Sequence, residues 1–274
     1  MFINCNGTLV NVQTPLVMGI INLTPDSFFS SSRAENDNQI LHSCEKMLAA
    51  GATFIDIGGY STRPGASHIS EEEELSRVIH GVKTIKKSFK DVILSVDTFR
   101  SEVARIAVEN GVAMVNDISA GDDDPLMMKT IAKLQVPYIM MHKRGTPKNM
   151  NSFTSYGDVT QEVLDYLIEK VNTCTKIHIH DTVVDPGFGF AKTLDQNYTL
   201  LQNLDVLKIL KKPVLVGISR KKMIQEVIQS DAGNALNGTT VANTIALLKG
   251  ANILRVHDVK EAIECIKIVR QINK

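Results

Sequence analysis

Short apolar segments rich in β-branched residues recur along the chain and alternate with segments of helical periodicity. Eight of them are the expected strands: residues 16–21, 53–57, 92–96, 112–115, 136–141, 182–185, 213–217 and 252–256. Between them, apolar positions recur at helical spacing, as in residues 39–52 and in residues 158–174, which begin at the capping residue Asp158. Alternating strands and helices predict a parallel sheet.

The expected strands are apolar at nearly every position, which is typical of strands covered on both faces. Eight strand–helix units in 274 residues favour a single-domain (β/α)8 TIM barrel over residues 1–274. An open doubly wound sheet is the alternative, but it predicts a G-x-G-x-x-G turn where residues 22–27 read NLTPDS. Ahead of the first strand, residues 2–10 predict a β-hairpin that turns at Asn6 and Gly7 and plugs the barrel floor.

Charge and cysteine content narrow the possible partners. Thirty Lys and Arg balance thirty Asp and Glu, so we expect no binding to nucleic acid or to an anionic membrane. The four cysteines are scattered without C-x-x-C spacing, and no run of about 18 apolar residues occurs, so we expect a cytoplasmic protein. The charged residues between 70 and 90 predict a solvated helix capped by Ser70, with Glu73 as its capping-box partner.

Polar side chains follow nearly every expected strand. A parallel barrel gathers the carboxyl ends of its strands at one rim, which predicts one site built from them. In strand order these positions are Asn22, the loop after residue 57, Asp97, Asn116 and Asp117, His142, Asp185, Lys221, and finally Arg255 and His257. Asp and Asn also favour turns and helix caps, and we expect that simpler role for Asp117, Asp123 and Asp158.

The last strand carries two groups that cap nothing. Arg255 and His257 stand two positions apart in ILRVHDV, so their side chains point to the same face of the strand. Because unpaired burial would be costly, we expect a bound anion between them. Arg63, in a loop rich in Gly, Ser, Thr and Pro, is expected to approach the same anion.

A second set of residues after the strands is suited to bind a flat heterocyclic ligand. Asp97, Asn116 and Asp185 offer acceptors and an amide for its N–H edge. Phe190 and Met140 offer apolar contact, although a lone methionine also suits core packing.

Two other chemistries have weaker support. His178 and His180 form an H-x-H pattern, but it precedes a strand and therefore belongs to the opposite rim, where a surface turn is expected. Lys221 is a candidate Schiff-base lysine, although its place between Arg220 and Lys222 favours a hydrogen-bonding or charge role.

Nine segments, taken together and in order, make the whole chain resemble bacterial dihydropteroate synthases. They are MGIINLTPDSF, DIGGYSTRPGA, SVDTFR, NDISAGD, MHKRGTP, DPGFGFAKT, GISRKKMI, GTTVAN and RVHDVKEA. The resemblance implies a TIM-barrel homodimer that joins p-aminobenzoate to (7,8-dihydropterin-6-yl)methyl diphosphate. The implied products are 7,8-dihydropteroate, for folate synthesis, and pyrophosphate.

The resemblance also implies roles for individual residues. The residues implied to hold the pterin are Asp97, Asn116, Asp185 and Lys221, and those implied to hold the diphosphate are Arg63, Arg255 and His257. Asn22 is the implied magnesium ligand. The implied aminobenzoate pocket, which sulfonamides also enter, consists of Thr62, Pro64, Phe190 and Ser219. The catalytic groups among them would be Asp97, Lys221, Arg255 and His257. In such enzymes the C–O bond breaks before the amine attacks, so the chemistry demands electrostatic stabilisation more than a strong base.

The chain departs from the family pattern at residues 28–33 (FFSSSR), Tyr60, Lys143 and Lys222, which leaves the first loop and the fit of inhibitors open. One alternative function is that of a methyltetrahydrofolate:corrinoid methyltransferase, which binds pterin but no diphosphate. The other is a non-catalytic pterin-binding barrel, which would tend to lose the loop residues present here.

Overall fold

A closed barrel of parallel strands forms the centre of the protein. The computed structural model describes residues 1–23, 33–61, 68–146 and 149–272. Eight strands form one sheet in the order β8-β7-β6-β5-β4-β3-β10-β9. Their bounds are β3 (Leu16–Asn22), β4 (Phe54–Gly58), β5 (Ile93–Asp97), β6 (Met114–Asp117), β7 (Tyr138–Met141), β8 (Thr182–Asp185), β9 (Leu215–Val216) and β10 (Ile253–Val256). The wall closes where Val184 bridges to Val214 and the Val184 N–H donates to the Pro213 carbonyl, 2.9 Å away. The predicted (β/α)8 barrel is therefore confirmed.

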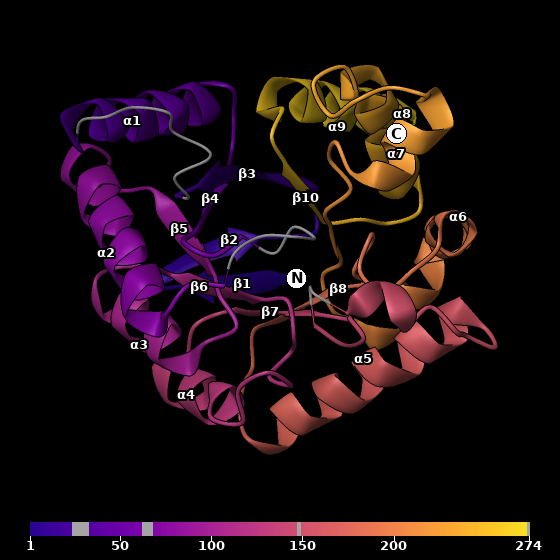
Figure 1. Ribbon diagram of the computed structural model, residues 1–274, viewed down its shortest axis with the longest axis horizontal. Coiled ribbons are helices and arrows are strands. Elements are labelled where there is room, and N and C mark those ends of the chain that lie inside the picture. The colour runs from indigo at the N-terminus through magenta and orange to yellow at the C-terminus, as the bar shows by residue number, and fades with distance from the viewer. Residues whose placement is uncertain (24–32, 62–67, 147–148, 273–274) are drawn as a thin grey trace.

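Helices surround this barrel on the outside (Figure 1). Their bounds are α1 (Arg33–Ala49), α2 (Glu71–Ser88), α3 (Ser101–Glu109), α4 (Met127–Leu134), α5 (Val159–Lys176), α6 (Leu194–Gln202), α7 (Lys222–Ile228), α8 (Leu236–Leu248) and α9 (Val259–Ile272), with 3-10 turns η2 (Met150–Ser152) and η3 (Leu204–Leu210). Asp158 caps α5 by accepting from the Thr160 and Gln161 N–H groups, as predicted.

The helix over residues 71–88 differs in two respects from the one expected. Ser70 caps it, but the Glu73 carboxylate pairs with Arg77 instead of completing a capping box. Glu74 is fully buried, not solvated, and accepts hydrogen bonds from Arg100 at 2.7 Å and from the Thr98 hydroxyl at 2.6 Å. A carboxylate removed from water needs such partners, so this part of the charge run is structural.

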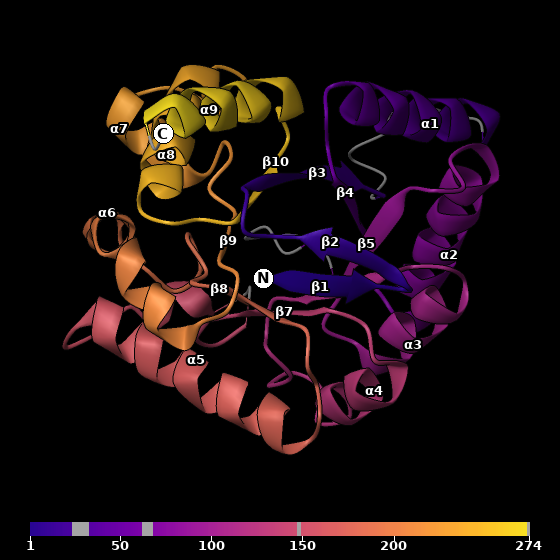
Figure 2. The same ribbon diagram turned by 180° about the vertical axis from the view of Figure 1, so that it is seen from behind.

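The N-terminal hairpin covers one end of the barrel. β1 (Phe2–Cys5) and β2 (Thr8–Asn11) pair antiparallel through a turn in which Asn6 and Gly7 have φ values of 51° and 89°. Positive φ at both positions is what a tight two-residue hairpin turn requires. Buried hairpin side chains such as Ile3 and Val10 pack against the first interior residues of the strands, including Phe54 and Ile253. The hairpin lies across the barrel end at the amino ends of the strands, as predicted (Figure 2).

Side-chain alternation along the strands determines what fills the interior. In β4, Phe54 belongs to the inner apolar layer, whereas Ile55 and Ile57 pack outward against the helices. The interior position between those two is occupied by Asp56. The inner apolar layer therefore occupies the hairpin end, and polar side chains occupy the interior toward the carboxyl ends of the strands.

Candidate active site

Four side chains from four strands meet inside the barrel and are linked through Asp56 and Arg255. Asp56 Oδ2 accepts a hydrogen bond from Arg255 Nε at 2.7 Å and one from Asn116 Nδ2 at 3.0 Å. Arg255 Nη2 donates to Asp97 Oδ2, also at 2.7 Å. Residues from β4, β5, β6 and β10 thus form one polar cluster, as expected if the carboxyl ends of barrel strands build a common site.

Asp56 is the member of this cluster that sequence reasoning missed. It is fully buried, and its Oδ1 atom contacts no hydrogen-bond partner among the described residues. A signal was present, because a lone carboxylate within the apolar strand FIDIG is the same anomaly that singled out Arg255. The premise that Arg255 lacks a protein partner is correspondingly wrong, since Asp56 and Asp97 both pair with it.

The electrostatics of the cluster follow from two carboxylates sharing one guanidinium. Burial raises the pKa of Asp97 to about 7, against the opposing effect of Arg255. Burial alone would lower the pKa of Arg255, but Asp56 and Asp97 hold it above its ordinary value, so the guanidinium stays charged. The cluster therefore combines a permanent cation with a carboxyl group whose proton is easily gained or lost near neutral pH.

A second group lies at the ends of β8 and β9. Asp185 is buried, and its Oδ1 accepts from the Gly187 N–H at 2.7 Å. Lys221, which precedes α7, donates from Nζ to the Phe188 carbonyl at 2.6 Å, and the same nitrogen lies 4.8 Å from the centre of the Phe190 ring. Burial lowers the pKa of Lys221 to about 8, and Asp185 opposes that shift. The acid and the amine therefore stabilise each other's charge.

Arg255 lies in β10 and His257 directly follows the end of that strand, and their side chains have different partners. His257 Nδ1 lies 3.1 Å from Ser219 Oγ, and the His257 N–H donates to the same hydroxyl at 3.2 Å. Arg255, two residues earlier, pairs with the carboxylates of the cluster. The two side chains thus have separate protein partners, and a common face for them stays a prediction.

The remaining predicted residues fall into three cases. Asn22 ends β3 and is half-buried. Met140 is wrong as a site residue: it is fully buried in the outer core, with its Sδ 3.3 Å from Cys174 Sγ. The predicted contacts at Thr62, Arg63 and Pro64, and the departures at residues 28–32, lie outside the described residues.

Comparison with known proteins identifies the family. A family model described as "Pterin binding enzyme" matches residues 18–257. The chain belongs to this pterin-binding enzyme family. It is 41% identical over 265 residues to the dihydropteroate synthase of Escherichia coli (strain K12), a match that covers 96% of this chain and 93% of the relative.

Solved structures of pterin-binding enzymes share the whole fold. The Yersinia pestis dihydropteroate synthase with a sulfonamide drug complex matches with a TM-score of 0.93 at 39% identity, covering 100% of this chain and 99% of that chain. The Xanthomonas albilineans dihydropteroate synthase in complex with 7,8-dihydropteroate matches with a TM-score of 0.89 at 32% identity, again covering 100% and 99%.

The described departures from the family pattern lie outside the polar cluster. Tyr60 packs edge-on against Phe99, with ring centres 5.2 Å apart. Lys143 is buried and pairs with Asp123 at 2.8 Å, so the expected cap role of Asp123 is replaced by an ion pair. Lys222 is exposed and lies 3.3 Å from Glu226 on α7.

Asp117, also expected to act locally, does so. Its carboxylate accepts hydrogen bonds from the Ser119 and Gly121 N–H groups, each at 2.7 Å. It also accepts one from the Tyr138 hydroxyl at 2.6 Å. Asp117 therefore holds the turn after β6, as predicted.

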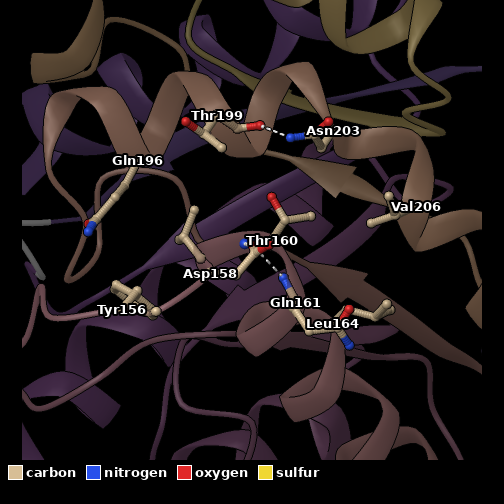
Figure 3. Close-up of a pocket in the computed structure, with 11 residues that line it drawn as sticks. Tyr156, Asp158, Thr160, Gln161, Leu164, Gln196, Thr199, Asn203 and Val206 are labelled. Carbon is tan, nitrogen blue, oxygen red and sulfur yellow. Dashed lines mark hydrogen bonds between the residues drawn. The ribbon is translucent and has the colours of Figure 1, made fainter.

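Two other places on the molecule do not compete with the barrel site. His178 and His180 lie in the turn before β8, and no group of three or more potential metal ligands occurs among the described residues. A groove of about 590 Å³ lies outside the barrel between α5 and α6, lined by residues such as Gln161 and Thr199 (Figure 3). None of the described residues that line it is basic, so it lacks the charge that a diphosphate requires.

Proposed function

We propose that the chain is a dihydropteroate synthase. It condenses p-aminobenzoate with (7,8-dihydropterin-6-yl)methyl diphosphate and yields 7,8-dihydropteroate and pyrophosphate in folate biosynthesis. The observation that carries the proposal is the polar cluster of Asp56, Asp97, Asn116 and Arg255 inside the carboxyl end of a pterin-binding barrel. The sulfonamide and 7,8-dihydropteroate complexes of similar enzymes support it.

The pterin binds in the deep interior. Its ring carries several N–H groups, and the carboxylates of Asp97 and Asp185 are matching acceptors. The Asn116 amide donates to Asp56, which leaves the Asn116 oxygen as an acceptor for the ligand. Lys221 adds a donor beside Asp185. We assign Phe190 and Ser219 to the aminobenzoate, together with Thr62 and Pro64, which are outside the described residues.

The reaction requires stabilisation of a departing diphosphate. Arg255 keeps its charge under all working conditions, and His257, with Arg63, adds donors toward the leaving group. Carboxylates near the pterin stabilise the positive charge that develops on the ring when the C–O bond breaks. The neutral arylamine is already nucleophilic, so the site needs no strong base to activate it.

Magnesium is part of the proposal, with Asn22 as its ligand from this chain. No described residue hydrogen-bonds to the Asn22 side chain, and its amide oxygen is the hard donor type that Mg²⁺ prefers. A single protein ligand suffices because Mg²⁺ takes most of its ligands from phosphate and water. The bound ion would neutralise negative charge on the diphosphate.

The proposal extends to a cytoplasmic homodimer of single-domain chains. Helix α8 exposes Val241, Ile245 and Leu248, which recur on one face and would be covered in a dimer. All four cysteines are free and buried, as expected in a reducing compartment. Among the described residues, no helix is long and apolar enough to cross a bilayer.

A coupled pyrophosphate assay tests the function. Purified protein should release pyrophosphate and form dihydropteroate, detected by mass spectrometry, only when both substrates and Mg²⁺ are present. Asp185→Asn should lose most of this turnover, whereas Asp165→Asn, a change on the exposed face of α5, should keep it. Folded protein that makes no dihydropteroate contradicts the proposal, and a requirement for a corrinoid would favour the methyltransferase.

A further inference from the structure

Lys192, which follows β8 and precedes α6, is a buried amine directly behind the proposed site. Less than a tenth of the residue is exposed. Its Nζ atom donates to the Gly187 carbonyl at 2.9 Å and to the Phe190 carbonyl at 3.1 Å, and it lies 3.0 Å from His142 Nδ1. These three partners match the three N–H bonds of an ammonium group.

His142 is suited to accept the third hydrogen bond. Burial lowers its pKa to about 2, and the neighbouring charge of Lys192 contributes in the same direction. The imidazole is therefore neutral, and with its proton on the other nitrogen it offers a lone pair at Nδ1. The His142 backbone N–H also donates to the Asp185 carbonyl at 3.0 Å. Lys192 thus ties the loop after β8 to the end of β7.

The loop held in this way carries several of the proposed substrate contacts. The Gly187 N–H donates to the Asp185 carboxylate, and the Phe188 carbonyl accepts from Lys221. The Phe190 ring lies beside the same lysine. Gly187 has a φ of +72°, and a Cβ atom there would lie 1.9 Å from the His142 carbonyl oxygen. The turn therefore lies tightly against β7 and transmits any displacement to its polar groups.

We propose that Lys192 is a positioning residue for the reaction: its amine holds residues 187–190 so that Asp185 and Lys221 meet the pterin while Phe190 meets the aminobenzoate. The inference rests on the proposed function. Lys192 itself contacts no reacting atom and acts through the turn. Loss of the amine leaves two buried carbonyls without their donor, and a buried unpaired acceptor is costly enough to make the turn rearrange.

Hydrogen bonds, more than the charges around it, hold the Lys192 amine in place. Asp185 favours the charged form, whereas Lys221 and Arg144 oppose it. Burial is the largest effect and lowers the pKa of Lys192 to about 7, and the amine can donate to both carbonyls in its charged and in its neutral form. An amine placed there only to fill space would be replaceable by an apolar side chain of similar length.

The test compares Lys192→Met with Lys86→Met in steady-state assays that vary each substrate separately. Lys86 is a matched control, because its partly buried amine also donates to two backbone carbonyls, those of Lys90 and Val92, at the end of α2. Lys192→Met should raise the KM for both substrates by about tenfold or more, as expected when buried hydrogen bonds that position the site are lost. Lys86→Met should leave both KM values within about twofold of wild type.

The division between KM and kcat separates positioning from a merely structural role. A variant that only folds less well contains fewer active molecules, so its apparent kcat falls while its KM values stay unchanged. His142→Phe keeps a ring but removes the Nδ1 acceptor, and it should raise both KM values by a smaller factor.

The outcomes are distinguishable. Unchanged KM values in Lys192→Met overturn the inference. If Lys192→Met does not fold, unchanged KM values in His142→Phe overturn it instead. If wild-type protein makes no dihydropteroate, the proposed function fails first.

Discussion

Removal of the Arg255 guanidinium should destabilise the folded protein as well as the reaction. The sequence alone suggested that substrate is the partner of this side chain, so that its loss would affect turnover far more than stability. The structure changes that expectation, because Arg255 pairs at 2.7 Å with both Asp56 and Asp97. Arg255→Met keeps much of the apolar stem and leaves the two carboxylates facing each other without a cation.

The size of the expected loss of stability follows from the burial of Asp56, Asp97 and Arg255. Asp56 is fully buried, and the side chains of Asp97 and Arg255 are only 15% and 20% exposed. Removing one partner of a buried ion pair costs about 3–5 kcal/mol, because the remaining charge is uncompensated. With an unfolding entropy of roughly 2.1 cal/mol/K per residue, a chain of 274 residues should then lose about 5–9 °C in Tm.

The measurement is thermal and urea unfolding of the ligand-free protein, followed by circular dichroism. Arg105→Met is the matched control, because Arg105 also pairs with two carboxylates, Glu102 and Glu109, each at 2.6 Å, but is 41% exposed. Exposed ion pairs add little to stability, so the Tm of Arg105→Met should fall much less than that of Arg255→Met. Asp97→Asn combined with Arg255→Met should recover part of the loss, since it removes one of the two unpaired charges.

The pH dependence of the stability of Arg255→Met provides a second test of the prediction. The uncompensated carboxylates of Arg255→Met can bind protons in the folded state at a pH where the unfolded chain has released them. The loss of Tm in Arg255→Met relative to wild type should therefore be larger at pH 8 than at pH 5. A Tm loss equal to that of Arg105→Met at both pH values would refute the view that Arg255 is held by protein carboxylates.

Two further predictions concern Lys221 and helix α8. Burial lowers the pKa of Lys221 from its ordinary value of 10.5 to about 8, so the unfolded chain binds more protons between these values. The free energy of unfolding of wild type relative to Lys221→Met should accordingly increase from pH 8 to pH 10, and a flat difference in urea titrations would contradict this. Val241→Glu with Ile245→Glu should convert a dimer to monomers in sedimentation experiments. Ile209→Glu, at another exposed apolar position, should not, and a double variant that remains dimeric would exclude this face as the interface.

Features that depend on local periodicity were predictable from the chain. The eight strands, the hairpin turn at Asn6 and Gly7 and the cap at Asp158 each follow from neighbouring residues, and the structure confirms all of them. Observed strand ends differ by one or two residues from those predicted, as in β9, which is limited to Leu215–Val216. The alternation of side chains was equally predictable, because it is a property of any extended strand: Asp56 lies between the outward-facing Ile55 and Ile57.

Partners could not be predicted in the same way, because they come from distant parts of the chain. Arg255 meets Asp56 across 199 positions and Asp97 across 158 positions. Only closure of the barrel brings them together, because no local sequence pattern shows which interior positions lie at the same height along the barrel axis. The same reason explains why Met140 was assigned to the site although it packs outward against Cys174, and why Glu74 was expected in water although it is buried. The periodicity of the chain thus determined which residues lie on each strand and face, whereas barrel closure decided which charges are neighbours and therefore which are compensated.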